Sequence, residues 1–491
     1  MPEPATPASS PSDLHYLSAT DALALFRTRE LSPVELLEAV IARAEQTEPD
    51  VNAFSFTYYD RALEQAKAAE RVYANDPDSA RPLEGLPIGL KDEVEIAGEP
   101  ATAASLAYRD DVAEQTTPLG ERILESGGII HARTTTPEFC CAGFTHSKLY
   151  GVTRNPWNLH YGVGGSSGGS GASLAAGSST LASGSDIGGS IRIPASFNGV
   201  VGFKPPYGRV PVEVPFNMDT YCHNGPLART VADCALFENA LAGPHPDDHT
   251  SLRPKLEIPA ELDGIEGLRI GVTIDYGGWA VDPEVRRNTL DAAMALRDVG
   301  AVVEEVDLVV DREMVDRAIG VHYQTMFAAW IGGEAEKYGD LLNDYSIEFA
   351  RITKERGGGV SVLEGMQVET ELWRPIGALF EQYDVLIAPT SASRGFVAGD
   401  GYVGKGFEVD GQTLPSYIDA LMTPLFNLAS RCPVLNVPSG FADNGVPTGI
   451  QIVARTFDDV TAFRVGAALE QVRPFWAGQQ PSFTSEPFGS D

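Results

Sequence analysis

Residues 155–205 constrain the fold most, because this segment is dense in glycine and serine and yet is punctuated by large apolar residues. A flexible linker of this composition would lack the isoleucine, valine, leucine and phenylalanine that recur here. Glycine lets the backbone turn without a side chain in the way, and the apolar residues need a core to pack against. The segment therefore predicts folded, glycine-rich turns rather than a tether.

Short apolar strands and amphipathic helices alternate along the rest of the sequence, a pattern typical of α/β proteins. A helix is expected to begin after Ser32, with Pro33 at its first position and Glu35 completing a capping box. Further helices are expected near 118–126, over 283–298 and through much of 310–375. Strands are predicted at 86–94, 127–133, 268–273, 301–308, 383–390, 436–441 and 449–455.

The domain organisation follows from the length of the chain and from its lack of linkers. At 491 residues the chain exceeds the usual size of one core, so two domains or one unusually large domain are expected. No segment between 80 and 470 has a linker's composition, which favours one large α/β domain over 13–480. Residues 1–12, rich in proline, alanine and serine, are expected to be a disordered tail, and 481–491 a C-terminal tail.

Charge and cysteine content limit the partners and the compartment. The chain has 68 acidic and 36 basic residues, and its net charge of -32 would repel nucleic acid backbones and anionic membrane surfaces. Its five cysteines include no CxxC pair, so we expect free thiols and neither a disulfide framework nor a metal site. With no signal-like N-terminus and no run of 18 apolar residues, the sequence predicts a cytoplasmic protein.

Two familiar interpretations of the glycine-rich segment fit poorly. A phosphate-binding loop follows the pattern G-x-x-x-x-G-K-[ST], and no lysine follows these glycines. Residues 164–168 nominally match the G-x-S-x-G of a nucleophile elbow. That elbow requires a buried strand just before its serine, whereas the residues upstream of Ser166 are NPWNLHYG, without an apolar run. The elbow is therefore disfavoured.

Two serines lie in separate glycine clusters 24 residues apart, Ser166 in GGSSGGSG and Ser190 in SDIGGSIR. Acyl transfer needs a nucleophilic oxygen beside backbone N–H groups that point at the developing oxyanion, and glycines leave those groups unobstructed. The predicted donors of this oxyanion hole are the N–H groups of Ile187, Gly188, Gly189 and Ser190. Asp186 and Arg192 are expected to hold this loop rather than to touch substrate.

A nucleophilic serine also needs a base, and the histidines are poor candidates for that role. None of the eight histidines lies in a segment that looks like a catalytic turn, and most stand beside Pro, Asp or Thr. Lys91 directly follows the apolar run 86–90, so a strand would bring its amine to a sheet edge, where active sites commonly lie. Lys91 is therefore the predicted base.

The motifs that contain these residues resemble the amidase signature family. The family's lysine segment, G-x-P-x-x-x-K-D, is matched by residues 85–92, its glycine and serine run by GGSSGGSGA, and its nucleophile segment by SDIGGSIRIPASFNGVVGFKP. Further matches are EFCCAG, YGVTRNPWN, GPLARTVADCAL and VPSGFADNGVPTGIQIVAR. These motifs span residues 20–470 in the family's order, so the resemblance is specific.

The resemblance implies a fold, an activity and a set of catalytic roles. The fold would be a single domain in which helices cover a mixed central β-sheet. The activity would be hydrolysis of the C–N bond of a small-molecule carboxamide, which gives a carboxylate and ammonia or an amine and needs no cofactor. Ser190 would be the nucleophile that forms the acyl-enzyme, Ser166 the cis-serine that relays its proton, and Lys91 the base.

A lysine that serves as a base must be neutral, whereas an ordinary lysine has a pKa of about 10.4. Work near pH 7 therefore needs a pKa depression of roughly 3 units, which corresponds to about 4 kcal/mol. Burial among glycines and serines would supply part of this depression. We therefore expect the pKa of Lys91 to be lowered.

The resemblance also indicates which residues line the pocket. The segment EFCCAGF lies beside the acyl group in family members, so Cys140, Cys141 and Phe144 are predicted to bind substrate, the cysteines as small apolar contacts. Residues 310–375 correspond to the part that the family varies most and are predicted to shape the rest of the pocket. Two departures from the family pattern, Pro206 and one extra residue in NLASRCP, argue against transferring a substrate preference from any one member.

Two rival functions remain to be weighed. Amidotransferase A subunits, which act on mischarged tRNA within a heteromeric complex, usually read D-T-G-G-S where this chain has DIGGS at 186–190, and the isoleucine favours a free-standing amidase. A non-catalytic scaffold would be expected to have lost a triad residue, and all three are present. Homodimers are common in the family, although no segment of this sequence identifies an interface.

Overall fold

The computed structural model describes residues 11–485. Residues 1–10 and 486–491, which make up most of the two predicted tails, lie outside the described residues. Residues 11 and 12, which the sequence assigns to the first tail, instead begin a short 3-10 helix, Pro11–Tyr16.

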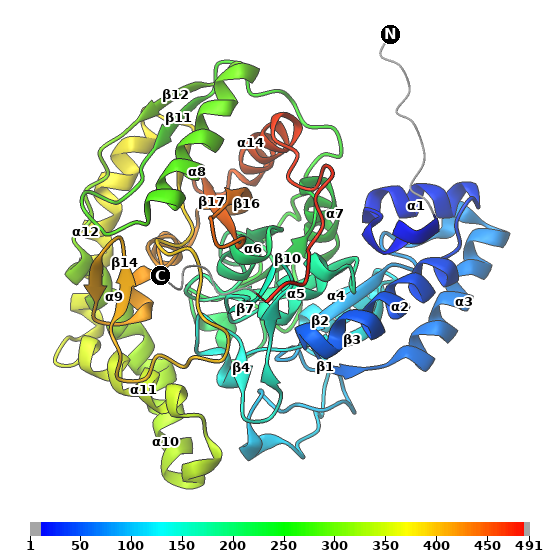
Figure 1. The fold of residues 1–491 in the computed structure, drawn as a ribbon, viewed down its shortest axis with the longest axis horizontal. Helices are drawn as coiled ribbons and strands as arrows, with labels where there is room; N and C mark the ends of the chain where they lie inside the picture. Colours follow the sequence, from blue (N-terminus) through cyan, green and yellow to red (C-terminus); the bar gives the residue numbers. More distant parts are fainter. Residues whose placement is uncertain (1–10, 486–491) are drawn as a thin grey trace.

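A mixed sheet of 11 strands runs through the described part of the chain and forms its centre (Figure 1). In sheet order the strands are β1 (Phe54–Thr57), β3 (Ile129–Thr134), β2 (Pro87–Lys91), β8 (Leu181–Asp186), β10 (His223–Ala228), β9 (Val201–Lys204), β16 (Val434–Phe441), β17 (Pro447–Ala454), β13 (Val385–Pro389), β11 (Arg269–Val272) and β12 (Val302–Glu305). Strand β2 runs parallel to both β3 and β8, and β11 runs parallel to both β12 and β13. The other neighbouring pairs are antiparallel.

Three two-stranded ribbons lie outside the central sheet. They are β4 (His146–Ser147) with β5 (Gly151–Val152), β6 (Arg154–Asn155) with β7 (Asn158–Gly162), and β14 (Phe407–Val409) with β15 (Gln412–Leu414).

Helices cover the sheet on both sides. They are α1 (Ala19–Thr28), α2 (Pro33–Val51), α3 (Tyr59–Asn75), α4 (Pro118–Glu125), α5 (Gly168–Ala176), α6 (Arg192–Asn198), α7 (Val231–Leu241), α8 (Pro283–Ala295), α9 (Arg312–Tyr323), α10 (Ala329–Tyr338), α11 (Asp344–Gly357), α12 (Val362–Phe380), α13 (Leu425–Leu428) and α14 (Asp459–Val472). The predicted capping box at the start of α2 is confirmed.

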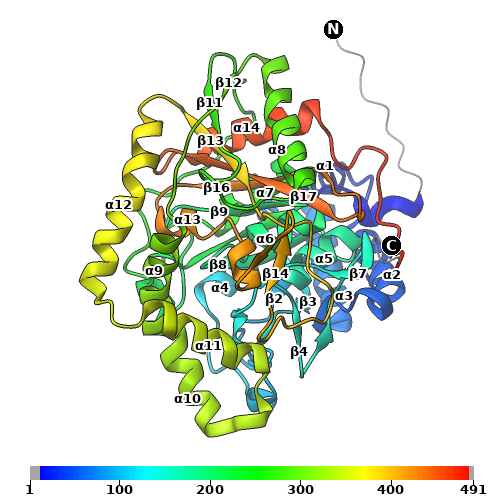
Figure 2. The ribbon, with the colours of Figure 1, turned by 60° about the vertical axis from the view of Figure 1, so that its left-hand side comes forward.

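Neighbouring residues of β9 show that α6 and α14 lie on opposite faces of the sheet. A Cβ added at Gly202 would lie 2.8 Å from Cβ of Ala195 in α6. The ring of Phe203, the next residue, packs on Phe463 of α14 with 4.7 Å between ring centroids. Because successive side chains of a strand point to opposite faces, the sheet is buried between two helical layers. Figure 2 shows the strands between these helices. The expected single domain with a mixed sheet is confirmed.

The sequence misses four strands of the central sheet, of which β8 and β10 lie beside the predicted catalytic residues. These two strands have the sequences LASGSD and HNGPLA, which are rich in residues that disfavour strands in isolation. Every residue of both strands is buried, and each strand pairs with neighbours on both sides. Tertiary packing therefore overrides the local preference of these segments.

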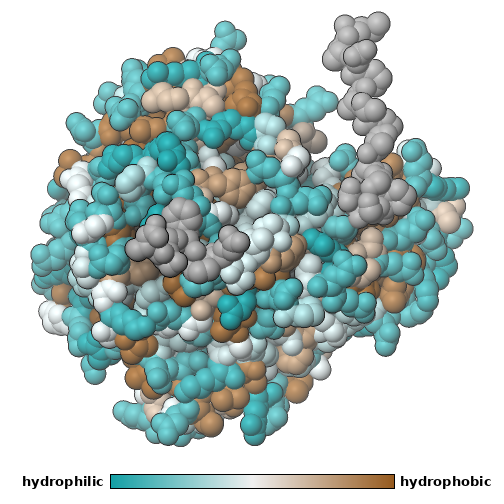
Figure 3. Space-filling model, in the orientation of Figure 1, coloured by the Kyte–Doolittle hydropathy of each residue, from teal (hydrophilic) through white to brown (hydrophobic). Residues whose placement is uncertain are grey.

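The face of the molecule seen in Figure 3 is mostly hydrophilic, with apolar side chains scattered among the polar ones. No helix within residues 11–485 is both long enough and apolar enough to cross a membrane. All five cysteines are free thiols.

Candidate active site

Two parallel strands bring the predicted base to the edge of the sheet. Lys91 is the last residue of β2, and the neighbouring strand β8 ends at Asp186. Because parallel strands end at the same edge, Lys91 lies beside the residues that close β8. The backbone N–H of Lys91 donates to Oγ of Ser183 across this boundary, at 3.0 Å.

The side chain of Lys91 is fully buried and contacts three oxygen atoms. Its Nζ lies 2.9 Å from Oγ of Ser166, 2.7 Å from Oγ of Ser185 and 2.9 Å from Oε1 of Glu93. Ser166 stands just before α5, and the peptide bond between Gly165 and Ser166 is cis. The structure thus brings two of the three predicted catalytic residues into direct contact.

The charges around Lys91 correct the expectation of a lowered pKa. Burial by itself lowers the pKa of Lys91, but the acidic groups beside it, Cys140 and Glu93 foremost, outweigh burial and raise it. Burial also raises the pKa of the Cys140 thiol well above its ordinary value, so this thiol is neutral near pH 7. Glu93 is then the anion that faces the lysine. The contact with Glu93 is then the part of this effect that persists near pH 7, where it opposes the lowering of the Lys91 pKa by burial.

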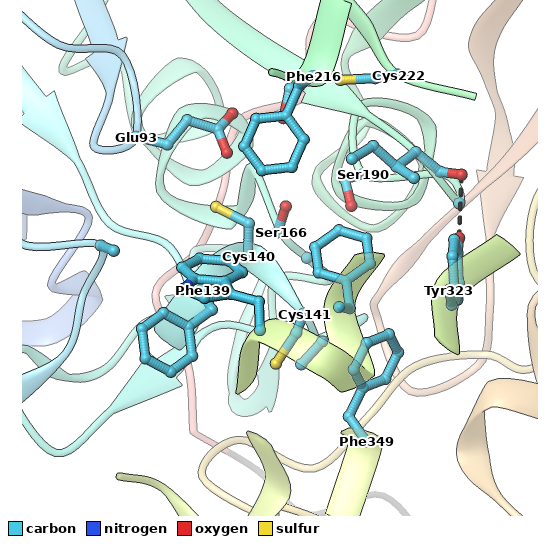
Figure 4. Close-up of a pocket in the computed structure, with 18 of the residues that line it drawn as sticks. Glu93, Phe139, Cys140, Cys141, Ser166, Ser190, Phe216, Cys222, Tyr323 and Phe349 are labelled. Atoms are coloured by element: carbon cyan, nitrogen blue, oxygen red, sulfur yellow. Dashed lines mark hydrogen bonds between the residues drawn. The ribbon is translucent and has the colours of Figure 1, made fainter. Parts of the chain in front are cut away.

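Ser190 faces the same cavity as Ser166, as Figure 4 shows. It follows the glycine pair 188–189 at the end of β8 and precedes α6, which begins at Arg192. The backbone N–H of Ser167 donates to the carbonyl oxygen of Ser190 at 3.1 Å and joins the two serine segments. The three predicted catalytic residues therefore gather at one place, with Lys91 behind Ser166 and Ser190 on the wall of the cavity.

The loop of residues 186–190, called here the nucleophile loop, is shaped by its two glycines. Gly189 has φ +122°, which side chains other than hydrogen rarely allow, and a Cβ there would collide with Thr423. The carbonyl oxygen of Gly188 accepts a hydrogen bond from Oγ1 of Thr423 at 2.6 Å. The carbonyl oxygen of Ile187 accepts one from the hydroxyl of Tyr323 at 3.0 Å, drawn in Figure 4. Both carbonyls are thereby held in fixed directions.

The four predicted oxyanion donors do not all have free N–H groups. The N–H of Gly189 already donates to Oδ1 of Asp186 at 2.8 Å. Within residues 11–485, the N–H groups of Gly188 and Ser190 have no hydrogen-bond acceptor. Ile187, Gly188 and Ser190 line the cavity, whereas Gly189 does not.

Asp186 and Arg192 hold the nucleophile loop, as the sequence indicates. Both side chains are fully buried, and Nη2 and Nε of Arg192 lie 2.9 and 3.0 Å from the two carboxylate oxygens of Asp186. Arg192 also donates to the carbonyl of Thr423 and the amide oxygens of Gln451 and Asn427. Burial by itself raises the pKa of Asp186, but Arg192 and the surrounding hydrogen bonds hold it well below its usual range. This ion pair is thus fully hydrogen-bonded.

The cavity has a volume of about 920 Å³ and is lined largely by apolar and aromatic side chains. One wall comes from α9, α10, α11 and the segment 324–328 between α9 and α10; we call these elements the helical wall. The aromatic residues that line the cavity are Tyr108, Phe139, Phe216, Trp279, Tyr323, Phe327, Trp330, Phe349 and Tyr417. The interiors of these walls are packed ring against ring; the centroids of Phe139 and Trp330, for example, are 4.9 Å apart.

The predicted pocket residues divide into two groups. Cys140 and Cys141 line the cavity. Phe144 does not line it; this side chain is buried behind the wall, where its ring stacks on His146 and packs edge-on against Tyr345. Phe144 therefore supports the wall from behind.

Sequence reasoning missed several residues with polar or ionisable side chains that line the same cavity as Ser166. They are Glu93, Ser185, Glu213 and Cys222. Ser185 is the first residue of the nucleophile segment, and Glu93 directly follows the lysine segment 85–92, so both lie in or beside the motifs that the sequence singles out. Burial and the charge of Glu93 raise the pKa of Glu213 to about 7. Within residues 11–485, no group of three or more His, Cys, Asp or Glu is arranged to hold a metal ion.

Comparison with known proteins places this site in a family. The chain matches the family model for amidases over residues 35–463. It is 34% identical to an acylamidase of Rhodococcus erythropolis, over 96% of this chain and 98% of that protein. It is 32% identical to the A subunit of the glutamyl-tRNA(Gln) amidotransferase of Lactiplantibacillus plantarum, over 90% and 93% of the two chains.

A solved structure shows the same likeness. A bacterial aryl acylamidase of the amidase signature family superposes with a TM-score of 0.85 and 29% identity, over 94% of this chain and 97% of that one. The family model, the relatives and the solved structure all indicate the same family, and each matches most of the chain. The chain therefore belongs to the amidase signature family and is a hydrolase that acts on amide C–N bonds.

Proposed function

We propose that this amidase cleaves its substrate through an acyl-enzyme on Ser190, with Ser166 as the proton relay and Lys91 as the base. The observation that carries this proposal is the 2.9 Å contact between Nζ of Lys91 and Oγ of Ser166, in a cavity wall that also holds Ser190. A buried amine that contacts a serine hydroxyl is the arrangement that proton relay requires.

The reaction follows in two halves. Oγ of Ser190 attacks the amide carbonyl carbon while its proton passes to Ser166, whose own proton passes to the neutral amine of Lys91. The tetrahedral intermediate collapses, the C–N bond breaks, and the proton returns from Lys91 through Ser166 to the leaving nitrogen. A water molecule then attacks the acyl-enzyme by the same relay. The products are a carboxylate and an amine or ammonia.

The oxyanion of this intermediate would be held by backbone N–H groups of the nucleophile loop. The N–H groups of Gly188 and Ser190 lack an acceptor within the described residues, and Ile187 lines the cavity beside them. Preorganised donors of this kind stabilise charge that develops in the transition state, typically by about 3 kcal/mol each. The proposed oxyanion hole uses Ile187, Gly188 and Ser190, since the N–H of Gly189 serves Asp186.

The substrate that fits this cavity best is an amide with a large apolar or aromatic substituent. A volume of about 920 Å³ is at the upper end of the range for small-molecule sites. The aromatic lining would bury rings and chains, and Cys140 and Cys141 would add small apolar contacts near the acyl group. The names of the acylamidase and the aryl acylamidase support this substrate class.

The A subunit of an amidotransferase is the second candidate, because relatives of that name match almost the whole chain at similar identity. We favour a free-standing enzyme because Ile187 stands where those subunits usually carry threonine, and because its side chain lines the cavity. One member of a heteromeric complex would need its partner chains for activity. A free-standing amidase would not.

The test is to purify the chain alone and assay a panel of amides. We expect hydrolysis of arylamides or long acyl amides without any added chain, and slower hydrolysis of acetamide and glutamine. Copurification with two further subunits, or glutaminase activity that depends on them, would support the amidotransferase instead. Light scattering on the same sample would show whether the chain forms the homodimer common in the family. Retention of all five free thiols in the active protein would support the expected cytoplasmic location.

A further inference from the structure

The three contacts of Lys91 suit both of its protonation states. As an ammonium it has three N–H donors for the oxygens of Ser166, Ser185 and Glu93. As a neutral amine it has two donors, for Ser185 and Glu93, and a lone pair that accepts the hydroxyl hydrogen of Ser166. Only the direction of the Lys91–Ser166 hydrogen bond changes between the two states. The charge of the remaining neighbours therefore decides which state prevails.

Glu93 is the carboxylate in direct contact with Lys91, whereas Glu213, with a pKa of about 7, is only partly ionised near neutral pH. The other titratable groups that face the pair are Cys140, Cys222 and Glu213. Burial raises the pKa of both thiols well above the ordinary value, so neither is an anion near pH 7. Asp92 turns away, because its carboxylate accepts hydrogen bonds from Ser55 and Thr102.

The carboxylate of Glu93 is itself held in place. Burial by itself would raise the pKa of Glu93, but Lys91 and hydrogen bonds from Cys140 and Ser185 lower it. Its side chain keeps 22% of its surface exposed, on the cavity side where Figure 4 shows it above Ser166 and Cys140. Glu93 therefore touches both the buried base and the space that substrate would enter.

We propose that Glu93 is a positioning residue for amide hydrolysis: its carboxylate holds the amine of Lys91 against Oγ of Ser166 and favours the ammonium over the neutral amine. Glu93 acts through Lys91 and forms no bond to substrate. As the pH rises, the ammonium loses its proton to solvent, and the amine, still held by Glu93 and Ser185, can accept the proton of Ser166. Activity therefore rises with pH up to the pKa of Lys91, and Glu93 moves that rise to higher pH.

The inference rests on the proposed triad, and its test does not need the natural substrate. A fluorophosphonate probe reacts with an activated serine, so its labelling rate from pH 6 to 11 reports the state of Lys91, whose pKa is raised from the ordinary value. We expect the rise in labelling rate to occur about 1 to 3 pH units lower in Glu93→Gln than in the unmodified protein, because an opposite charge this close shifts a pKa by that much. An unchanged rise would overturn the inference.

Matched variants separate charge from structure. Glu95→Gln removes a carboxylate from the same segment and the same cavity. The labelling rate of this variant should rise at the same pH as that of the unmodified protein. An equal shift in this control would overturn the inference, because the loss of any carboxylate in the cavity would then shift the pH at which labelling rises. Glu93→Asp keeps the carboxylate on a shorter side chain. The rise in labelling rate should therefore shift to lower pH by less than it does in Glu93→Gln. If Glu93→Gln does not fold, a downward shift in Glu93→Asp supports the inference, and no shift contradicts it.

Failure of the inference and failure of the proposed function are distinguishable. Labelling that survives in Ser190→Ala would overturn the proposed nucleophile, whatever Glu93 does. If Ser190→Ala abolishes labelling, the proposed nucleophile stands. If Glu93→Gln then labels with the same pH dependence as the unmodified protein, only the role of Glu93 is overturned.

Discussion

Fully buried charges hold the nucleophile loop, whereas the adjoining helical wall is packed by aromatic rings and by partly exposed ion pairs of Arg312 and Arg356 with Asp316. Asp186 and Arg192 are both fully buried and bind each other through two hydrogen bonds. In the wall, the ring centroids of Phe327 and Phe349 lie 5.8 Å apart, and both residues line the cavity. Removing one partner of a buried ion pair leaves an uncompensated charge, whereas a volume-conserving change in an apolar wall costs little. The comparison suggests that the loop provides the chemistry and the wall provides the fit to substrate.

The largest effect is expected on the loop side of the comparison. Ser190→Ala should lower turnover by about 10⁴-fold or more, because it removes the atom that bonds to the substrate. The change deletes one hydroxyl oxygen, so the free energy of unfolding should stay close to that of the unmodified protein. Amide turnover and a urea titration measure the two quantities. Turnover within tenfold of the unmodified protein would mean that Ser190 is not the nucleophile and that the reaction occurs elsewhere.

Breaking the buried ion pair should be the next largest effect. Arg192→Met leaves the carboxylate of Asp186 buried without its partner, which should cost about 3 to 5 kcal/mol of unfolding free energy. Arg351→Met, which removes the pairs that this half-exposed arginine makes with Glu348 and Glu355 on α11, is the control and should cost less than about 1 kcal/mol. Equal losses in the two variants, measured by urea denaturation, would mean that the loop is no more rigidly specified than the wall.

Acid should weaken the same pair. Because the pKa of Asp186 is held below its usual value, its carboxylate stabilises the fold fully above the unfolded pKa of about 3.9 and loses that contribution as the pH falls further. Asp186→Asn lacks the titrating group. The difference in unfolding free energy between the unmodified protein and Asp186→Asn should therefore be constant from pH 7 to 5 and narrow below pH 4. A difference that stayed constant to pH 3 would contradict this role for the ion pair.

The smallest effect is expected in the helical wall, and it should depend on the substrate. Trp330→Ala removes a ring that lines the cavity and packs on Phe139. For a bulky arylamide, kcat/KM should fall by about 10- to 100-fold, because about 1 to 3 kcal/mol of apolar contact is lost. Hydrolysis of acetamide should change little. Equal losses for both substrates would show that the wall supports the chemistry and not only the fit.

The sequence predicts the loop side of the site better than the wall side. The apolar run 86–90 places Lys91 at the end of a strand, and the structure ends β2 there. The glycines beside Ser190 indicate a sharp turn, and Gly189 has the positive φ that such a turn uses. These features are local, so a short motif is enough to reveal them.

Features that depend on distant segments could not be read from the sequence. The strands β8 and β10 become strands only through their neighbours in the sheet. The contact between Glu93 and Lys91 depends on how the chain turns after β2, and it opposes the lowering of the lysine's pKa that burial alone would give. Phe144 does not line the cavity; instead Tyr345 and Tyr417, from remote segments, pack around its ring.

The most direct test of the proposed mechanism is to map where a fluorophosphonate probe bonds to the protein. Intact mass spectrometry and peptide mapping would give the number of adducts and the residue that carries each one. We expect a single adduct on Ser190, lost in Ser190→Ala and formed much more slowly in Lys91→Ala. An adduct on Ser166 or on any other residue, with Ser190 unmodified, would contradict the account.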